Sequence, residues 1–568
     1  MKLKKQEFKE FMTKTIRPER SELLMPAGDL GKLKTAVIYG ADAIYCGTPD
    51  LSLRTKSGFS LEELVEGIEF AHKYGKRVYL TLNLFSHNKD YEKLPEFVNT
   101  VRSVKPDGVI IADPGVFAYV KEHAPEIELH VSTQANICSW MTVKFWEDMG
   151  AGLAVLAREV SFEELKEIRQ KCPDIKLETF VHGAMCMTYS GRCLLSNFMS
   201  ERGANQGNCA HSCRWNYKLH VKLRDGKTEV LEINEDNKDM FEFLLEEQFR
   251  PGEFMPIEED LRGSYILNSK DLCLMPVLDE YMDLGIDSLK VEGRHKNEYY
   301  VGAVARAYRK AIDDFYLYGK DSWKSDIYMR ELEAIRNRGY TMAFHQGRLE
   351  NHAHDYDTTA SISEWSFGGM ITKWDDEHLV LEVRNTLRSG DVLEFLPPIS
   401  EYYHSLEPIR IRLYDFTLND AHGTVVEQVN PGQKQSIRIH KDLFHAEDLE
   451  HLKLQMPVGT VARAETITLT EAHEARTQIR SKSHKAESGK IKVEFYEKFK
   501  EKNLEKAQVN NPELAKKPKD KDNGCCGRGC NGCLVFWHDD KYAKARELIK
   551  GKKQGVMLEK KFIEGSSK

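Results

Sequence analysis

The chain has 568 residues, of which 41% are hydrophobic and 30% are charged. This length predicts more than one domain, and the composition excludes a wholly disordered or collagen-like chain. The 82 Lys and Arg residues are outnumbered by 89 Asp and Glu residues, so nucleic-acid binding would depend on local basic patches.

The N-terminal segment, residues 1–20, is rich in lysine and lacks an apolar core of signal-peptide length. No run of about 18 apolar residues occurs in the chain, so we expect a cytoplasmic protein with no membrane partner. The twelve cysteines are then expected to be reduced, and clustered ones indicate metal or redox sites.

Short apolar runs alternate with helical segments through the first half of the chain. The predicted strands are 22–28, 43–47, 77–83, 108–113, 128–136, 153–159, 176–183 and 287–293. The predicted helices include 31–39, 60–74, 91–104 and 161–171, and Ser60 and Ser161 have capping-box spacing to Glu63 and Glu164. Eight such units predict an α/β fold, a (β/α)8 TIM-like barrel.

The pattern changes after the barrel. We expect the barrel at 21–330 with an insertion at 219–267, followed by a small all-β C-terminal domain at 331–475. A charged linker at 476–524 and a Cys-rich, basic tail at 525–568 complete the chain.

Polar residues follow several predicted strands, at the barrel end where reactive groups collect. We take His182, Tyr189, Glu159 and Glu292 as candidate catalytic groups, and Arg54, Arg158, Gln134 and Arg294 as candidate substrate-binding groups. The arginines could hold a small dicarboxylate. Each of these residues can equally be a structural hydrogen-bonding group, and the arginines can pair with Glu159 or Glu292.

Four cysteines lie within 28 residues, directly after the seventh predicted strand, with the spacing C-x6-C-x15-C-x3-C. They are Cys186, Cys193, Cys209 and Cys213, and Cys273 is a fifth candidate for the same site. Thiolates suit zinc or an iron–sulphur cluster, and the absence of C-x2-C pairs favours a cluster. The isolated Cys46, Cys138 and Cys172 are expected to be buried apolar residues.

The tail predicts a second metal site, for zinc or another cluster. Its ligands would be Cys525, Cys526, Cys530 and Cys533, with glycines that let the backbone wrap an ion. The same segment matches G-x-G-x-x-G, but it follows a charged linker and no strand, which argues against a dinucleotide loop.

Several segments together resemble the collagenase-like peptidase family, and within it the prephenate-dependent tRNA uridine hydroxylases. They are Glu22-Leu-Leu-Met-Pro-Ala-Gly, Asp42-Ala-Ile-Tyr-Cys-Gly, His182-Gly-Ala-Met-Cys-Met-Thr-Tyr-Ser-Gly-Arg-Cys, Cys209-Ala-His-Ser-Cys-Arg-Trp and Leu289-Lys-Val-Glu-Gly-Arg. The likeness covers roughly residues 20–470 and leaves out the linker and tail.

The resemblance implies a 4Fe-4S cluster held by Cys186, Cys193, Cys209 and Cys273, with Cys213 as the alternative ligand. It also implies prephenate as co-substrate and 5-hydroxyuridine at the tRNA wobble position as product. Candidate RNA contacts are the basic tail and the face bearing Arg306, Arg309 and Lys310. An electron donor is a further candidate partner.

Three alternatives stay open on the sequence. The chain could be a peptidase, although it has no H-E-x-x-H or G-x-S-x-G motif and a metal would occupy the clustered thiols. It could hydroxylate a cytidine of ribosomal RNA, or it could bind RNA or carry a cluster without catalysis.

Overall fold

The computed structural model describes residues 20–47, 59–83, 86–185, 270–347 and 365–465, the last with gaps at 414–415, 421–422, 427, 433–434 and 446–447. Between 220 and 265 it describes the backbone of short strands. These form three antiparallel pairs: β8 (His220–Val221) with β9 (Leu231–Glu232), β10 (Leu244–Glu246) with β11 (Phe254–Pro256), and β12 (Glu258–Asp260) with β13 (Gly263–Tyr265). The predicted segment before residue 20, the linker and the tail lie outside the described residues.

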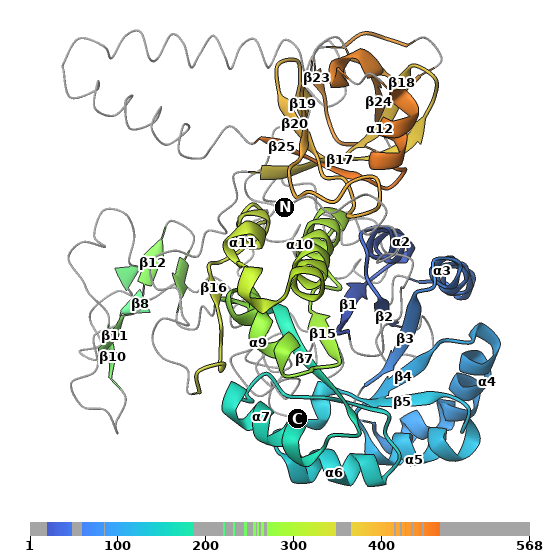
Figure 1. Ribbon diagram of the computed structural model, residues 1–568, viewed down its shortest axis with the longest axis vertical. Helices are drawn as coiled ribbons and strands as arrows, with labels where there is room; N and C mark the ends of the chain where they lie inside the picture. The colour runs from blue at the N-terminus through green and yellow to red at the C-terminus, as the bar shows by residue number, and fades with distance from the viewer. Residues whose placement is uncertain are drawn as a thin grey trace, which may run out of the picture. The chain divides into compact units, whose positions relative to one another are not determined.

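Eight parallel strands close into a barrel, which confirms the predicted fold class (Figure 1). The last strand closes it by pairing with both the first and the seventh. The strands are β1 (Glu22–Ala27), β2 (Ala43–Gly47), β3 (Arg77–Leu82), β4 (Gly108–Ile111), β5 (Glu128–Val131), β6 (Leu153–Val155), β7 (Lys176–Ala184) and β15 (Ser288–Val291).

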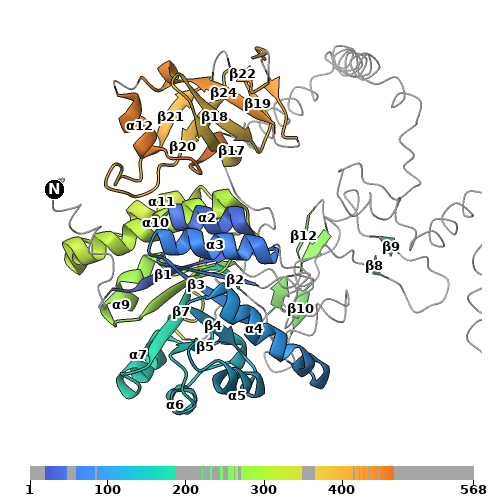
Figure 2. The same ribbon diagram turned by 90° about the vertical axis from the view of Figure 1, so that its right-hand side faces the viewer.

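Helices cover the outside of the barrel (Figure 2). They are α2 (Leu30–Ile38), α3 (Leu61–Lys73), α4 (Leu94–Val104), α5 (Pro114–His123), α6 (Trp140–Asp148), α7 (Phe162–Lys171), α9 (Leu278–Asp283), α10 (Glu298–Tyr318) and α11 (Asp326–Glu333). Both predicted capping boxes, at Ser60 and Ser161, are present. No helix in the described part of the chain is long and apolar enough to cross a bilayer.

Some predicted boundaries are wrong by several residues. The strand predicted at 128–136 ends at Val131, because the Ser132 side chain accepts a hydrogen bond from the backbone of Gln134 and starts a 3-10 turn, η2 (Thr133–Ala135). The helix predicted at 91–104 begins with the 3-10 turn η1 (Asn88–Lys93), and α4 follows it.

The barrel sheet carries two additional strands beyond the predicted eight. β14 (Asp271–Cys273) pairs antiparallel with β7, so that Cys273 lies opposite His182 and Asp271 opposite Ala184. β16 (Tyr340–Thr341) pairs parallel with β14. The chain therefore approaches the predicted cysteine block, 186–213, along a strand that neighbours Cys273.

Alternation along the strands separates two layers of side chains. On β1, Leu23 and Met25 pack into the large cluster beneath the helices, whereas Leu24 belongs to a second cluster inside the barrel. That inner cluster consists of Leu24, Ala43, Tyr45, Tyr79 and Ile110. Charged groups, among them Glu178 and Lys290, are buried near it.

The C-terminal region is rich in β-structure and has its own apolar core. Its seven-stranded antiparallel sheet has the order β21-β20-β25-β17-β18-β24-β22. These are β17 (Trp365–Trp374), β18 (His378–Val383), β20 (Val392–Phe395), β21 (Ile409–Arg412), β22 (Thr417–Leu418), β24 (Ser436–His440) and β25 (Val461–Glu465). A separate pair, β19 (Leu387–Arg388) with β23 (Gln428–Val429), and α12 (Leu449–Gln455) complete the region.

Buried polar contacts join this region to the barrel. The Tyr39 hydroxyl donates to the carbonyl of Leu396 at 2.6 Å and accepts from the backbone N–H of Val461 at 2.9 Å. Arg306, on α10, donates from Nε to the carbonyl of Pro397 at 2.8 Å. Its guanidinium also lies 3.3 Å from the Glu331 carboxylate.

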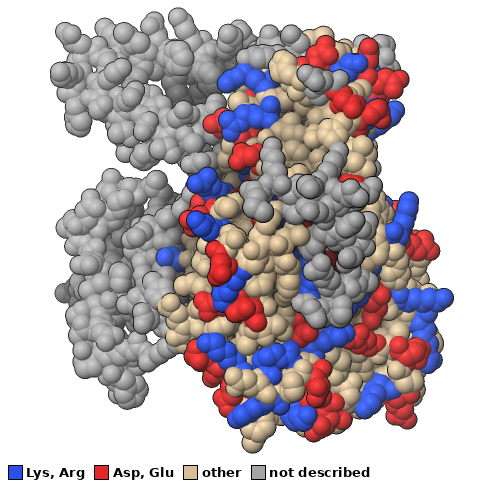
Figure 3. All heavy atoms as spheres, in the orientation of Figure 1, with Lys and Arg blue, Asp and Glu red and all other residues tan. Residues whose placement is uncertain are grey.

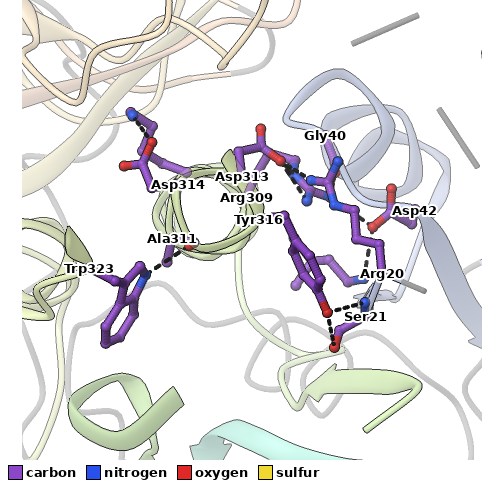
Figure 4. A network of polar contacts seen from close by, with 12 residues as sticks. Arg20, Ser21, Gly40, Asp42, Arg309, Ala311, Asp313, Asp314, Tyr316 and Trp323 are labelled. Atoms are coloured by element: carbon purple, nitrogen blue, oxygen red, sulfur yellow. Dashed lines mark hydrogen bonds and ion pairs between the residues drawn. The ribbon is translucent and has the colours of Figure 1, made fainter. Parts of the chain in front are cut away.

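The prediction that a face of α10 contacts RNA is wrong. Arg306 is fully buried against the C-terminal region, and Arg309 is 3% exposed. Figure 4 shows Arg309 bound to Asp313 and Asp42. Lys310 pairs with Asp314 on the same helix. These cations are taken up by structural partners, because α10 is packed on both the barrel and the β-rich region.

Candidate active site at the barrel mouth

The candidate site lies where the parallel strands end, because all eight strands of such a barrel point their carboxyl ends at one rim. Here that rim is called the mouth. In the described residues it carries Gln134 after β5, Arg158 and Glu159 after β6, and Glu292 and Arg294 after β15. The structure thus brings predicted residues from three separate loops to one end of the barrel.

Arg158 and Glu292 interact across the mouth. The Arg158 guanidinium lies 3.6 Å from the Glu292 carboxylate, and its side chain is only 7% exposed. It also stacks over Phe180 of β7, with the guanidinium carbon 3.9 Å from the ring centre. Such stacking is favoured for a planar guanidinium, so the Arg158 side chain is held from two sides.

Tyr45 of β2 connects these groups to Arg294. The Tyr45 hydroxyl donates to the carbonyl of Val291 at 3.0 Å and lies 3.5 Å from the Glu292 carboxylate. The Arg294 guanidinium lies 5.7 Å from the centre of the Tyr45 ring. Burial, and then the charge of Glu292, raise the pKa of Tyr45 well above its usual value, so the phenol stays protonated.

Charged groups of both signs surround Tyr45. Three cations act on it, Arg158, Arg294 and Lys290, against the carboxylates of Glu292 and Glu178. Burial lowers the pKa of Arg294, and its Nε atom has no hydrogen-bond partner among the described residues. A half-buried guanidinium with a buried, unpartnered Nε favours an anionic ligand, since buried charges are normally paired.

Gln134 adds a buried acceptor to the mouth. Ser132 accepts a hydrogen bond from the Asn83 side chain at 3.1 Å and another from the Gln134 backbone at 3.3 Å, which fixes the turn. The Gln134 side chain is 7% exposed, and its Oε1 atom finds no partner within the described chain. Buried polar atoms normally have partners, so this oxygen is placed for a ligand or water donor.

Two glycines allow the loops to approach closely. Gly183, on β7, has a φ of +117°, and a Cβ there would lie 2.5 Å from the carbonyl oxygen of Glu292. A Cβ on Gly28 would lie 2.2 Å from the carbonyl oxygen of Arg294. Glycine at both positions therefore lets the segment that carries Glu292 and Arg294 sit against β1 and β7.

His182 lies in a cluster of tyrosines. Its ring is 2% exposed and packs with the rings of Tyr300, Tyr308 and Tyr340, at centre-to-centre distances of 5.4 to 5.9 Å. Burial, and then the nearby Lys296, lower the pKa of His182 to about 3, so the imidazole is neutral near pH 7. Its catalytic role stays a prediction, as does that of Glu159, which has a half-buried side chain beside Arg158.

Cys273 is the predicted cluster ligand that the structure describes. Its sulphur lies 3.9 Å from the Tyr308 hydroxyl and 3.8 Å from the Met329 sulphur, and the residue is 1% exposed. Burial raises the pKa of its thiol to about 12, so metal binding would have to displace a proton. A soft, buried thiol next to the strand leading to Cys186 is chemically suited to a cluster.

Other predicted site residues lie outside the described residues. They are Arg54, Tyr189, Cys186, Cys193, Cys209 and Cys213, with Cys525, Cys526, Cys530 and Cys533 of the tail. The isolated Cys46 and Cys172 are buried, as predicted, whereas Cys138 is half-buried.

Sequence reasoning did not identify Tyr45, Phe180 or Lys290 as residues at or below the mouth. Each stands in an apolar strand, where an aromatic or a single lysine gives no signal distinct from core packing. The one usable signal was period-two alternation, which places Lys290 on the inner face of β15 because Leu289 and Val291 pack outward.

Comparison with known proteins gives the family. A sequence model described as Peptidase family U32 matches residues 28–355. The chain is 40% identical over 408 residues to tRNA hydroxylation protein P of Escherichia coli K12, covering 68% of this chain and 88% of the relative. It is 39% identical over 438 residues to the Haemophilus influenzae protein of that name, covering 72% and 93%.

A more distant relative is the 23S rRNA 5-hydroxycytidine C2501 synthase of Escherichia coli K12. It is 30% identical over 387 residues, which cover 67% of this chain and 53% of that relative. The family match covers more than half of the chain and the first relatives are matched over most of their length, so this protein belongs to peptidase family U32.

Proposed function

We propose that this protein is an RNA nucleoside hydroxylase that converts the wobble uridine of tRNA to 5-hydroxyuridine. The observation that carries the proposal is the 40% identity, over 88% of its length, to a relative named for tRNA hydroxylation. The two arginines at the mouth are consistent with it, because an anionic co-substrate and an RNA base can both approach the open end of the barrel.

The proposed co-substrate is prephenate, which carries two carboxylates. Arg158 and Arg294 would bind these groups, and the position of the two guanidinium groups beside the Phe180 and Tyr45 rings supports that assignment. Arg54, which the sequence also suggests, lies outside the described residues. Arg158 would then exchange its contact with Glu292 for one with a substrate carboxylate, since the Arg158 and Glu292 side chains are 3.6 Å apart without a ligand.

The target uridine would have to leave its stack to reach the mouth. The unpartnered Gln134 Oε1 is an acceptor that could take the N–H of a uracil edge. On the face shown in Figure 3, Lys and Arg side chains are interspersed with Asp and Glu and form no extended basic surface, so the basic tail stays the candidate RNA contact. A cytoplasmic location follows from such a substrate.

The proposed 4Fe-4S cluster would be held by Cys186, Cys193, Cys209 and Cys273, with Cys213 as the alternative ligand. When bound, the cluster would supply electron transfer or act as a Lewis acid. The position of Cys273 on β14, paired with the strand that leads to Cys186, supports this ligand set. A second metal in the tail and an external electron donor remain part of the proposal.

Two alternatives have a specific basis. The family description names a peptidase, and the 30% identical relative is named for hydroxycytidine formation in 23S rRNA. Nucleoside mass spectrometry of tRNA and ribosomal RNA from a deletion strain distinguishes them. Loss of 5-hydroxyuridine from tRNA is expected. Loss of hydroxycytidine from ribosomal RNA would identify ribosomal RNA as the substrate in place of tRNA. Unchanged RNA would favour a peptidase.

A further inference from the structure

The interior of the barrel contains an ion pair directly below the mouth. Lys290 of β15 and Glu178 of β7 are 5% and 0% exposed, and their charged atoms are 2.7 Å apart. The second Glu178 oxygen accepts from the Ser288 hydroxyl at 2.9 Å. Both carboxylate oxygens are therefore engaged, and the lysine ammonium is held at one point.

Stability alone is a weak reason for such a pair. Removing two charges from water is costly, and replacing a buried ion pair with uncharged side chains of similar size is often neutral or stabilising. Barrels of this type usually fill their interior with branched aliphatic side chains. The side chains that the pair contacts are therefore the better guide to its role.

The contacts of Lys290 connect the ion pair to the aromatic rings at the barrel mouth. Its ammonium lies 4.5 Å from the centre of the Tyr45 ring and 5.5 Å from that of the Phe180 ring. These are the two rings that carry the mouth arginines, Arg294 over Tyr45 and Arg158 over Phe180. Each ring thus contacts the fixed interior cation and one guanidinium.

We propose that Lys290, fixed by Glu178, is a positioning residue for the dicarboxylate site. It holds Tyr45 and Phe180 in the orientation on which Arg294 and Arg158 rest, and it does not bind the ligand itself. Its own ammonium is satisfied by Glu178, so the lysine acts through the two rings. This inference rests on the proposed function of the mouth.

The test compares variants of the full-length protein by titration calorimetry with prephenate. Lys290→Met alone leaves Glu178 as an unpaired buried charge and is expected to lower stability. The double variant Glu178→Gln/Lys290→Met removes both charges and is expected to fold with a melting temperature close to that of the wild type. We expect it to bind prephenate about tenfold or more weakly, the scale of one or two lost cation–π contacts.

Two further measurements separate positioning from a general structural defect. The KM for prephenate should rise in Glu178→Gln/Lys290→Met, while kcat at saturating prephenate stays within about threefold. Lys310→Met/Asp314→Asn removes an ion pair on α10 that contacts neither ring, and its affinity should equal that of the wild type.

Equal prephenate affinity in the wild type and in Glu178→Gln/Lys290→Met would overturn the positioning role and leave the proposed function standing. An equal loss in the α10 control would also overturn it, since the effect would then be general. Absence of prephenate binding by the wild type would overturn the inference together with the assigned co-substrate, while the deletion-strain nucleosides test hydroxylation separately.

Discussion

At the scale of single residues, Glu22 is a buried carboxyl at the start of the first barrel strand. Burial raises its pKa to about 7, although Arg77 pairs with it and opposes the shift. The Tyr79 hydroxyl donates to it at 3.1 Å and the Ser288 hydroxyl at 3.2 Å. The folded protein therefore holds a proton here that the unfolded chain releases at lower pH.

This linkage predicts a pH effect on stability. Because the folded pKa is about 7 and the unfolded value is 4.5, stability falls as pH rises from 4.5 through 7, by up to about 3 kcal/mol. Glu22→Gln cannot titrate and should show a smaller fall in melting temperature between pH 5 and pH 8. Parallel curves for the two proteins would contradict the assignment.

Arg158 is a mouth residue whose side chain is held by Phe180 and Glu292. Arg158→Lys keeps the charge but loses the planar group that stacks on Phe180, so we expect the KM for the proposed co-substrate, prephenate, to rise about tenfold with little change in kcat. Arg102→Lys, at an exposed pair with Glu126, is the control and should behave as the wild type. An unchanged KM in Arg158→Lys would remove this residue from the site.

Part of the site could be predicted residue by residue. Arg158, Glu292 and Arg294 were identifiable because a polar residue that follows an apolar strand marks the rim of a barrel. Tyr45 and Lys290 were not, because their roles depend on the neighbours that the closed barrel brings together. The RNA face on α10 failed for the same reason, since the sequence does not show that Arg306 is packed under a second region.

At the scale of elements, the strands and helices of the barrel were predictable from alternation and capping. Strand β14 was not, because three residues are too few for a period and its pairing with β7 spans almost ninety positions of the chain. The C-terminal end of β5 and the start of α4 differ from the predicted bounds because 3-10 turns occupy the adjoining residues. Such turns depend on local side-chain hydrogen bonds, for example that of Ser132.

Gly183 lies where β7 approaches the segment that follows β15, and we expect a side chain at this position to be destabilising. Gly183→Ala combines a strained positive φ with a clash against the Glu292 backbone, and should lower the free energy of unfolding by about 1–3 kcal/mol and weaken prephenate binding. Gly285→Ala also has a positive φ, +73°, but nothing lies within 4 Å, so it should cost about 1 kcal/mol and leave binding intact. Equal behaviour of both variants would contradict a tight junction.

At the scale of the whole molecule, α10 connects the barrel to the β-rich region through buried cations. Arg306→Met would remove the donor to the Pro397 carbonyl and one of the two arginines beside the buried Glu331 carboxylate, and should lower the melting temperature clearly. Lys310→Gln should change neither tRNA affinity nor its salt dependence, measured by filter binding. A weaker, less salt-dependent complex in Lys310→Gln would restore this face as an RNA contact.

The proposed function places RNA hydroxylation at the barrel mouth. The most direct measurement is nucleoside mass spectrometry of tRNA from a deletion strain that expresses the wild type, Glu292→Gln, or the surface control Glu126→Gln at equal protein levels. We predict full 5-hydroxyuridine with the wild type and the control, and less than about a tenth of it with Glu292→Gln. Full restoration by Glu292→Gln would place the chemistry elsewhere and contradict the account.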